Sequence, residues 1–313
     1  MALGPRPLRT EQLARRLDHV SERSVYRYAA KLVKRELIER YEKEGVPSTV
    51  ILSLTDPPGR NLYRLLGRFA ATQLAELPSP DNVVQSWGPL KPFGQFWESG
   101  FVERLSREPR TLTQLAGGPH GLTFHQVSRR MRIFTDVGLV IAGPSRGHGK
   151  CYELTEHGRR RMALIVALGR WRQRFVLTGG RLGLTGTEMA TVIRAALPLI
   201  LLPNFAGMSI NLGVADPMDK YGQRTVEALQ GVIGEDGAIR CDLADRRTVD
   251  GSVVGTMNTW LGALLDGSRG RMRSGGDLAL VDACLIQLHD VLWEAARPDP
   301  PPHLGLYIEV PPS

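Results

Sequence analysis

The sequence predicts an α+β protein in which two copies of one small helix-and-hairpin module are followed by a separate α/β domain. Three observations lead to this prediction: an internal repeat, a basic first half joined to an acidic second half, and a change to strand-like patterns in the last third of the chain. The expected boundaries are residues 1–78 and 79–176 for the two modules and 177–313 for the last domain.

The repeat pairs Leu13 with Leu115, an offset of 102 residues. The same offset pairs Val20 with Leu122, Ser21 with Thr123, Val25 with Val127, Arg27 with Arg129, Leu32 with Phe134, Leu37 with Leu139 and Ile38 with Val140. Farther along, Leu52-Ser-Leu-Thr55 matches Tyr152-Glu-Leu-Thr155. Because the changes of offset fall in loops that contain Gly or Pro, the matches indicate two copies of one structural unit.

Each copy is expected to begin with a short helix, over Glu11–Leu17 in the first and Leu112–Ala116 in the second. A polar residue, Ser21 or Thr123, then caps a second helix. Apolar side chains recur along that helix at helical spacing, at Val25, Leu32 and Val33 in the first copy and at Val127, Met131 and Phe134 in the second. A hairpin follows, with its loop at Glu42–Ser48 or Gly143–Lys150, and a last helix closes each copy over Arg60–Leu77 or Gly158–Phe175.

The charge of the chain is divided unevenly between its two halves. Residues 1–176 hold 29 Lys and Arg against 16 Asp and Glu, whereas residues 177–313 hold 11 against 16. A basic half indicates contact with a polyanion. The absence of a long apolar run and of a signal peptide, together with three widely spaced cysteines, favours a cytoplasmic protein with reduced thiols and no membrane partner.

The second helix of each copy carries a polar, cationic face, and the hairpin loop of the second copy is basic. Helix, turn, cationic helix and basic hairpin are typical of a winged helix-turn-helix, whose second helix enters the major groove of DNA. We expect base contacts from Ser24, Arg27, Gln126 and Arg129, and phosphate contacts from Arg23, Lys31, Arg130, Arg146 and Lys150. Tyr28, Thr123, His125 and His148 complete the predicted DNA-binding set.

Two alternatives stand beside this interpretation. The cations of the second helix could form an ordinary solvated face. One copy could also have lost DNA contact and serve dimerisation, and the first copy is the better candidate, because its hairpin loop Glu42–Ser48 has no net positive charge.

The second copy resembles the HxlR-type branch of the MarR-like winged-helix regulators of bacteria. The resembling pieces are Trp97, Leu122-Thr-Phe-His-Gln-Val-Ser-Arg-Arg-Met131, Gly138-Leu-Val140, Tyr152-Glu-Leu-Thr155 and Trp171, and the resemblance covers residues 8–175 when the first copy is included. It implies a transcription regulator that works as a homodimer with one wing per chain. Here one chain carries two wings, so a pseudo-twofold arrangement could read two half-sites that differ in sequence. The N-terminal cysteine through which some members sense oxidants is missing.

The last domain is expected to begin after a Gly-rich linker at Leu177–Gly183 with a helix over Thr187–Pro203. Strands are expected over Ser209–Val214, Val226–Ile233, Ala238–Leu243 and Val249–Gly255, with a turn at Gly234–Gly237, and helices over Met257–Leu265 and Asp277–Ala296.

The stretch Thr259-Trp-Leu-Gly-Ala-Leu-Leu-Asp-Gly267, followed by Gly275-Gly-Asp-Leu278, resembles the end of a sterol-carrier-type domain over residues 185–296. The resemblance implies a small sheet backed by helices around an apolar tunnel, and binding of a lipophilic molecule or a role in dimer contacts. Candidates to line the tunnel are Leu201, Phe205, Met208, Met257, Trp260 and Leu264. The alternative is that all six belong to an ordinary core.

Together these features predict a DNA-binding transcription regulator that responds to a lipophilic or natural-product molecule. The alternative is a sequestration protein that confers self-resistance, such as antibiotic resistance, and has lost DNA binding. We expect no enzyme activity, no cofactor and no metal, because no GxGxxG motif after a strand, P-loop or HExxH motif is present.

Overall fold

The computed structural model describes residues 7–16, 21–43, 49–75, 90–98, 100–117, 121–146, 149–175, 184–215, 225–242, 248–268 and 272–294 of the chain. Helices and antiparallel strands follow one another through these ranges, which confirms the predicted α+β class. No helix in the described part of the chain is long and apolar enough to cross a membrane.

Module one, residues 7–75, contains two helices, a three-stranded sheet and a long last helix. Its elements are β1 (Leu8–Arg9), α1 (Thr10–Arg16), α2 (Glu22–Lys34), β2 (Ile38–Lys43), β3 (Thr49–Leu54) and α3 (Pro58–Ala75). The strands pair antiparallel in the order β1-β3-β2. A small core of its own joins Leu13 of α1 and Val25 of α2 to Ile38 and Leu52 of the sheet.

Module two, residues 90–175, repeats this order of elements after two additional helices. Its elements are α4 (Leu90–Glu98), α5 (Phe101–Arg107), β4 (Arg110–Thr111), α6 (Leu112–Ala116), α7 (Phe124–Asp136), β5 (Val140–Arg146), β6 (Gly149–Leu154), α8 (Glu156–Arg160) and α9 (Met162–Phe175). The strand order β4-β6-β5 corresponds to β1-β3-β2. The single closing helix expected over Gly158–Phe175 is divided into α8 and α9 at Arg161.

The two modules share the same junction between the second helix and the sheet. Thr55 Oγ1 donates a hydrogen bond to the carbonyl oxygen of Glu36 at 2.6 Å, and Thr155 Oγ1 donates to that of Gly138 at 2.5 Å. Both acceptor residues have left-handed backbone, with φ of 55° at Glu36 and 71° at Gly138. The same turn therefore ends α2 and α7, although only one copy uses the glycine that this conformation favours.

A glycine after each threonine completes the junction. A Cβ atom on Gly59 would lie 2.1 Å from the carbonyl oxygen of Leu37, and one on Gly158 would lie 2.2 Å from that of Leu139. Both distances are far inside van der Waals contact, so only glycine fits at either position. Gly59 and Gly158 are not among the residues that pair the two copies in the sequence, so this shared contact adds support to the repeat.

The hairpin of module two departs from the prediction. Most of the expected loop Gly143–Lys150 is strand, since β5 extends to Arg146 and β6 begins at Gly149. The pairing shifts between Ala142 and Ser145 and then resumes, so a β-bulge takes up the Gly143-Pro144 pair that made this stretch resemble a loop. In module one, residues 44–48 of the predicted loop lie outside the described residues.

The C-terminal domain, described over residues 184–294, is a five-stranded sheet with helices. Its elements are α10 (Gly186–Ala196), η2 (Leu197–Leu199), η3 (Pro203–Phe205), β7 (Ser209–Ala215), β8 (Thr225–Ile233), β9 (Ile239–Asp242), β10 (Gly251–Thr256), α11 (Met257–Asp266), β11 (Arg273–Gly276) and α12 (Leu278–Glu294). The strand order is β11-β10-β7-β8-β9, with β7 and β10 parallel and the other pairs antiparallel. The predicted turn at Gly234–Gly237 connects β8 to β9, as expected, whereas β11 was not predicted. The predicted linker at Leu177–Gly183 lies outside the described residues.

The helices α10 and α12 pack on the same face of this sheet. Glu227 on β8 reaches Arg194 of α10, and a Cβ on Gly251 of β10 would meet Leu280 of α12. The pairing of β8, β7 and β10 places Glu227 and Gly251 on one face. Buried residues therefore alternate along β10.

One continuous core joins module two to the C-terminal domain. Phe134 of α7, Met162 of α9, Ile193 of α10 and Trp260 of α11 all belong to the same cluster of buried side chains. Between α9 and α11, Arg170 pairs with Asp266 as well. The boundary at residues 176 and 177 stays a prediction, but the hydrophobic core extends across it.

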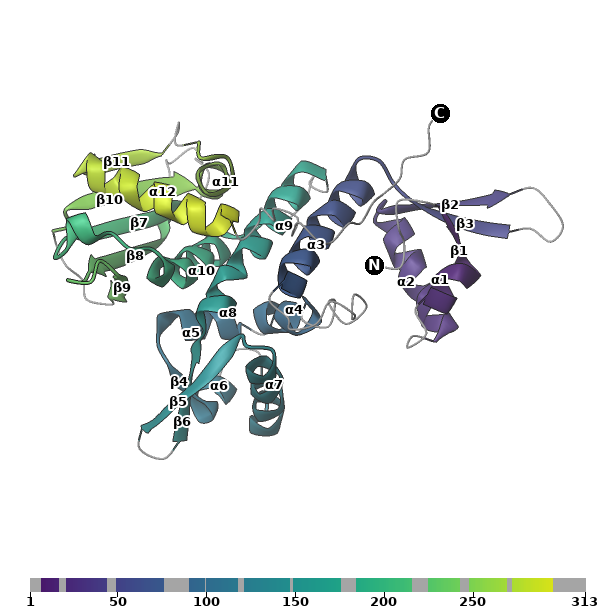
Figure 1. The fold of residues 1–313 in the computed structure, drawn as a ribbon, viewed down its shortest axis with the longest axis horizontal. Coiled ribbons are helices and arrows are strands. Elements are labelled where there is room, and N and C mark those ends of the chain that lie inside the picture. Colours follow the sequence, from purple (N-terminus) through teal and green to yellow (C-terminus); the bar gives the residue numbers. More distant parts are fainter. Residues whose placement is uncertain are drawn as a thin grey trace.

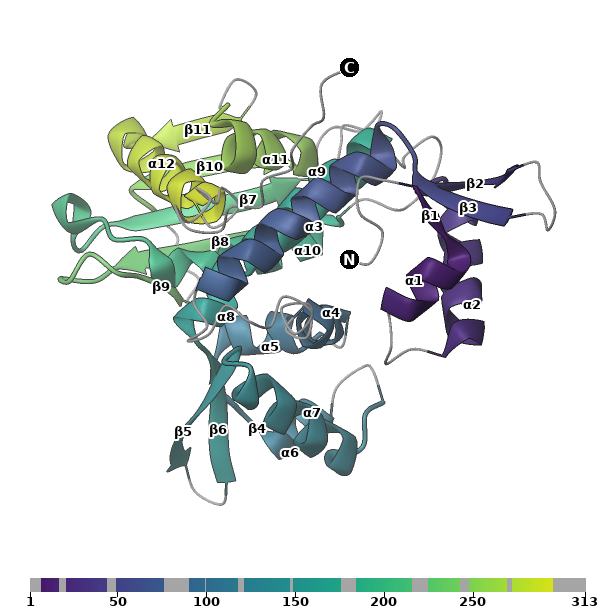
Figure 2. The ribbon, with the colours of Figure 1, turned by 45° about the vertical axis from the view of Figure 1, so that its right-hand side comes forward.

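Module one is joined to the rest of the molecule through α3, which lies beside α9 (Figures 1 and 2). These two helices are equivalent in the repeat. At one end of the pair, the indole Nε1 of Trp171 donates to the carbonyl oxygen of Pro58 at 3.1 Å. The first turn of α3 therefore meets the second half of α9, so the two helices run antiparallel (Figure 2).

Candidate nucleic-acid interface

The helix α7 is held by its first turn and by one buried face. Thr123 Oγ1 accepts from Gln126 N at 3.4 Å, and Gln126 Oε1 accepts from Thr123 N at 2.9 Å, which is a complete capping box. Val127, Met131 and Phe134 are fully buried. These contacts fix both the start of the helix and its rotation about its own axis.

The capping box changes the role expected for two predicted DNA-binding residues. The side-chain oxygens of Thr123 and Gln126 accept hydrogen bonds from backbone amides inside the helix start. Of the polar atoms of the Gln126 side chain, its amide NH₂ can still donate to an acceptor on DNA without breaking the cap. We therefore assign Thr123 to the helix and keep Gln126 only as a donor.

The face of α7 opposite its buried side carries His125 and Arg129, and both side chains are exposed. Arg132 lies on the same face one turn after Arg129 and is also exposed. Arg130 is half-buried and stands at the flank of this face. Arg132 was not among the residues predicted to bind DNA, although its spacing of three residues from Arg129 indicates that the two share one face of the helix.

The helix α2 of module one presents a similar surface. Ser21 caps it by accepting from Ser24 N at 3.3 Å, and Val25 is buried. Arg23, Arg27, Tyr28 and Lys31 are exposed, and Ser24 is half-buried. The guanidinium of Arg27 and the ammonium of Lys31 lie 5.3 Å and 5.9 Å from the centre of the Tyr28 ring. The ring thus gathers two cations on one side of the helix.

These cations have no carboxylate partner. Within the described residues, no Asp or Glu oxygen lies within ion-pair distance of Arg27, Lys31, Arg129 or Arg132. Elsewhere in the molecule Arg107, Arg160, Arg170 and Arg194 are all paired with acidic residues. Among the described residues, these exposed cations of the two second helices are therefore left without a carboxylate partner.

The hairpin of module two supplies one further described cation. Lys150 is exposed in β6, opposite Ser145 of β5. Arg146 ends β5, but its side chain lies outside the described part of the structure, as does all of His148. Their predicted contacts with DNA stay predictions.

The six residues predicted to line a tunnel do not meet at one place. Leu201, Phe205 and Met208 precede the first residue of β7, and Met257, Trp260 and Leu264 follow the last residue of β10. Because β7 and β10 run parallel and in register, Met208 and Met257 stand at opposite ends of this strand pair, about 20 Å apart for a seven-residue strand.

Burial divides these residues as well. Trp260 and Leu264 are fully buried, and the indole Nε1 of Trp260 donates to the carbonyl oxygen of Gly213 at 3.0 Å. Leu201 is 57% exposed, and Met208 and Met257 are half-buried at the edge of the main core. Trp260 and Leu264 belong to the buried core, and contact of any of the six residues with a ligand stays a prediction.

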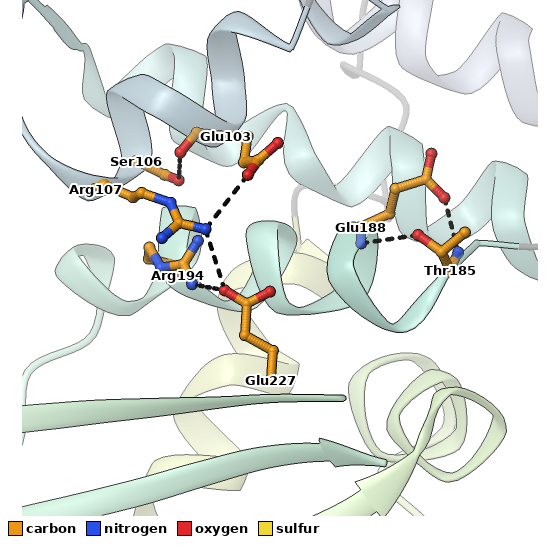
Figure 3. Close-up of polar contacts among 7 residues, drawn as sticks. All are labelled: Glu103, Ser106, Arg107, Thr185, Glu188, Arg194 and Glu227. Carbon is orange, nitrogen blue, oxygen red and sulfur yellow. Dashed lines mark hydrogen bonds and ion pairs between the residues drawn. The ribbon is translucent and has the colours of Figure 1, made fainter. Parts of the chain in front are cut away.

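A polar cluster crosses from module two to the C-terminal domain (Figure 3). Glu227 of β8 accepts from both Arg194 of α10 and Arg107 of α5, the second at 3.5 Å, and Arg107 also reaches Glu103 at 3.3 Å. The Arg194 side chain is 6% exposed and that of Glu227 is 17% exposed. The pair is therefore a buried ion pair at the contact between the two parts.

A second arginine strengthens the same contact from α8. Arg159 Nη1 donates to the carbonyl oxygen of Ala195 at 3.1 Å, and burial lowers the pKa of this guanidinium from its usual value. Burial raises the pKa of the nearby Cys241 thiol to about 11, against the opposing effect of Arg194 and Arg159. The thiol is therefore neutral at physiological pH and does not contribute charge to the cluster.

Among the described residues, no group of three His, Cys, Asp or Glu side chains could hold a metal ion. No family model matches the chain, and no curated protein matches it.

Proposed function

We propose that the chain is a DNA-binding transcription regulator that contacts the major groove with α2 and α7, the second helices of two winged helix-turn-helix modules. The observation that supports this most directly is positive charge without a carboxylate partner among the described residues, on Arg27 and Lys31 of one helix and on Arg129 and Arg132 of the other. Exposed cations without carboxylate partners suit phosphate oxygens, which bind them in exchange for released counterions.

One chain would engage two half-sites, one with each module. We take the two modules to be related as the subunits of a dimer would be, and the antiparallel packing of the repeat-equivalent helices α3 and α9 supports this. An operator for such a protein consists of two half-sites that need not be identical, because α2 and α7 differ in sequence. We further propose that the C-terminal domain, which resembles a sterol-carrier-type domain, binds a lipophilic effector.

The test is a fluorescence anisotropy titration of the full chain. Duplexes selected by the protein from a random pool would serve as ligand and a scrambled duplex as competitor. Contact with about six phosphates predicts a slope near −5 for the logarithm of affinity against that of salt concentration. A slope near zero with no preference between duplexes would reject the proposal and favour a sequestration protein.

A matched pair of arginine variants locates the interface. Arg129→Ala should weaken binding by about tenfold, within the usual range for a residue that contacts bases. Arg240→Ala removes another exposed arginine, on β9 of the C-terminal domain, and should leave affinity unchanged. Equal effects of the two variants would show that α7 is not the reading helix.

A further inference from the structure

Phe124, the first residue of α7, exposes an aromatic ring that the fold does not use. Its side chain is 49% exposed, whereas Phe96, Phe101 and Phe134 of the same module are fully buried and pack against one another. The ring of His125 stands edge-on to that of Phe124, with 6.2 Å between the ring centres. The exposed part of the ring is therefore available to a partner at the start of α7.

The position of this ring is well defined. The capping box of Thr123 and Gln126 encloses Phe124 and fixes the backbone of the first turn. The first turn of a helix in the major groove is the part that reaches the base edges. Phe124 thus exposes an apolar ring in the turn of α7 that would lie closest to the bases if this helix enters the major groove.

We propose that Phe124 packs on the C5-methyl group of a thymine in the half-site read by module two, an inference that rests on the proposed function. Thymine is the base that presents a methyl group in the major groove, and an aromatic side chain contacts it favourably without any hydrogen bond. The ring therefore selects thymine at one position of the half-site, while Arg129 and Gln126 contact neighbouring base edges.

Module one does not repeat this feature. The offset of 102 residues places Glu22 at the first position of α2. A carboxylate in the major groove accepts from the amino group of cytosine and has no apolar contact to offer a methyl group. The two half-sites are therefore expected to differ at this position, with thymine required only where module two binds.

The experiment replaces each thymine of the selected duplex, one at a time, with deoxyuridine, which lacks only the methyl group. The wild-type chain should lose about fourfold in affinity at one thymine of one half-site, as expected for one buried methyl group. Phe124→Ala should bind the unmodified duplex more weakly and should show no loss at that thymine.

Ile133→Ala is the control, because Ile133 is also an exposed apolar residue of α7 but stands nine residues farther along. This variant should keep the fourfold response of the wild type, and circular dichroism should show all three proteins folded. The inference is wrong if Phe124→Ala responds to every deoxyuridine as the wild type does, or if the wild type responds to none. A wild type that selects no sequence from the pool would instead reject the proposed function together with this inference.

Discussion

Removal of the charge of Glu227 should destabilise the unit formed by module two and the C-terminal domain. In Glu227→Gln the guanidinium of Arg194 stays buried, at 6% exposure, without its carboxylate. Loss of one member of a fully buried ion pair costs about 3–5 kcal/mol. Because Glu227 is 17% exposed and its second partner Arg107 is 36% exposed, we expect the lower end, about 3 kcal/mol.

Thermal unfolding followed by circular dichroism measures this loss. For a unit of about 200 residues, 3 kcal/mol corresponds to a decrease of roughly 6–12 °C in Tm. Glu103→Gln is the matched control, since it removes a carboxylate from Arg107 at an exposed i, i+4 pair that contributes less than about 1 kcal/mol. A decrease for Glu227→Gln no larger than that for Glu103→Gln would refute the reasoning.

A double variant separates the unpaired charge from lost packing. Arg194→Met combined with Glu227→Leu removes both charges and keeps apolar volume at the site. Replacing both members of a buried pair with apolar residues is often neutral, so most of the lost stability should return. If the double variant is as unstable as Glu227→Gln, the cost lies in packing and not in the charge.

Three further predictions follow from buried contacts. Gly158→Ala should destabilise the unit formed by module two and the C-terminal domain by at least about 2 kcal/mol. Gly59→Ala should lower the urea midpoint of a separate unfolding transition of module one and leave the other transition unchanged. A single shared transition would contradict the separate core of module one. Trp260→Phe loses the hydrogen bond to Gly213 and should lower the free energy of unfolding by roughly 2 kcal/mol in the same assay. An unchanged midpoint would argue against a structural role for Trp260 and favour contact with a ligand. Burial raises the pKa of Cys284 to about 12, so the unfolded chain releases this proton near pH 9 while the folded chain keeps it. This thiol should lower stability above pH 9 by about 1.4 kcal/mol per pH unit, in addition to the contribution of Cys241, and Cys284→Ala should remove its share of the slope.

The repeat could be predicted from the sequence because its signals are local. After the strand, the Gly158 N–H donates to Thr155 Oγ1 and the Gly59 N–H donates to Thr55 Oγ1, so each of these pairs is close in the sequence. The residue types that such a junction needs therefore recur in both copies, and they are visible as a repeat in the sequence. The spacing of apolar residues then gives α7 its correct length and buried face.

Two local patterns carry structural signals beyond the roles that were predicted from them. The pattern Thr-x-x-Gln at Thr123 and Gln126 is that of a capping box, and the structure shows the box complete. The stretch Gly143–Lys150 has the composition of a loop, but pairing between β5 and β6 overrides it and a bulge absorbs the proline. Local composition therefore indicates which secondary structures a segment can adopt, and here the pairing between β5 and β6 determines that most of it is strand.

The tunnel-lining set shows what one sequence leaves open. Met208 and Met257 are both apolar residues beside strand ends, and nothing in either neighbourhood reveals that β7 and β10 run parallel. That relation depends on contacts between residues about 40 positions apart, and it decides that the two methionines stand at opposite ends of the sheet. The buried pair of Arg194 and Glu227 is equally non-local and carried no signal in the sequence.

The continuous core limits how an effector could regulate DNA binding. The side chains of the C-terminal domain share one buried cluster with Phe134 of α7. A conformational change inside this domain would therefore move α7 together with the domain and not relative to it. Module one has its own core and meets the rest through α3 beside α9, with Trp171 at one end of the pair. A change in the spacing of α2 and α7 would therefore have to arise at this helix pair. An effector that works by spacing should alter the environment of Trp171 as well as operator affinity, and its indole fluorescence offers a direct signal in a Trp171-only background.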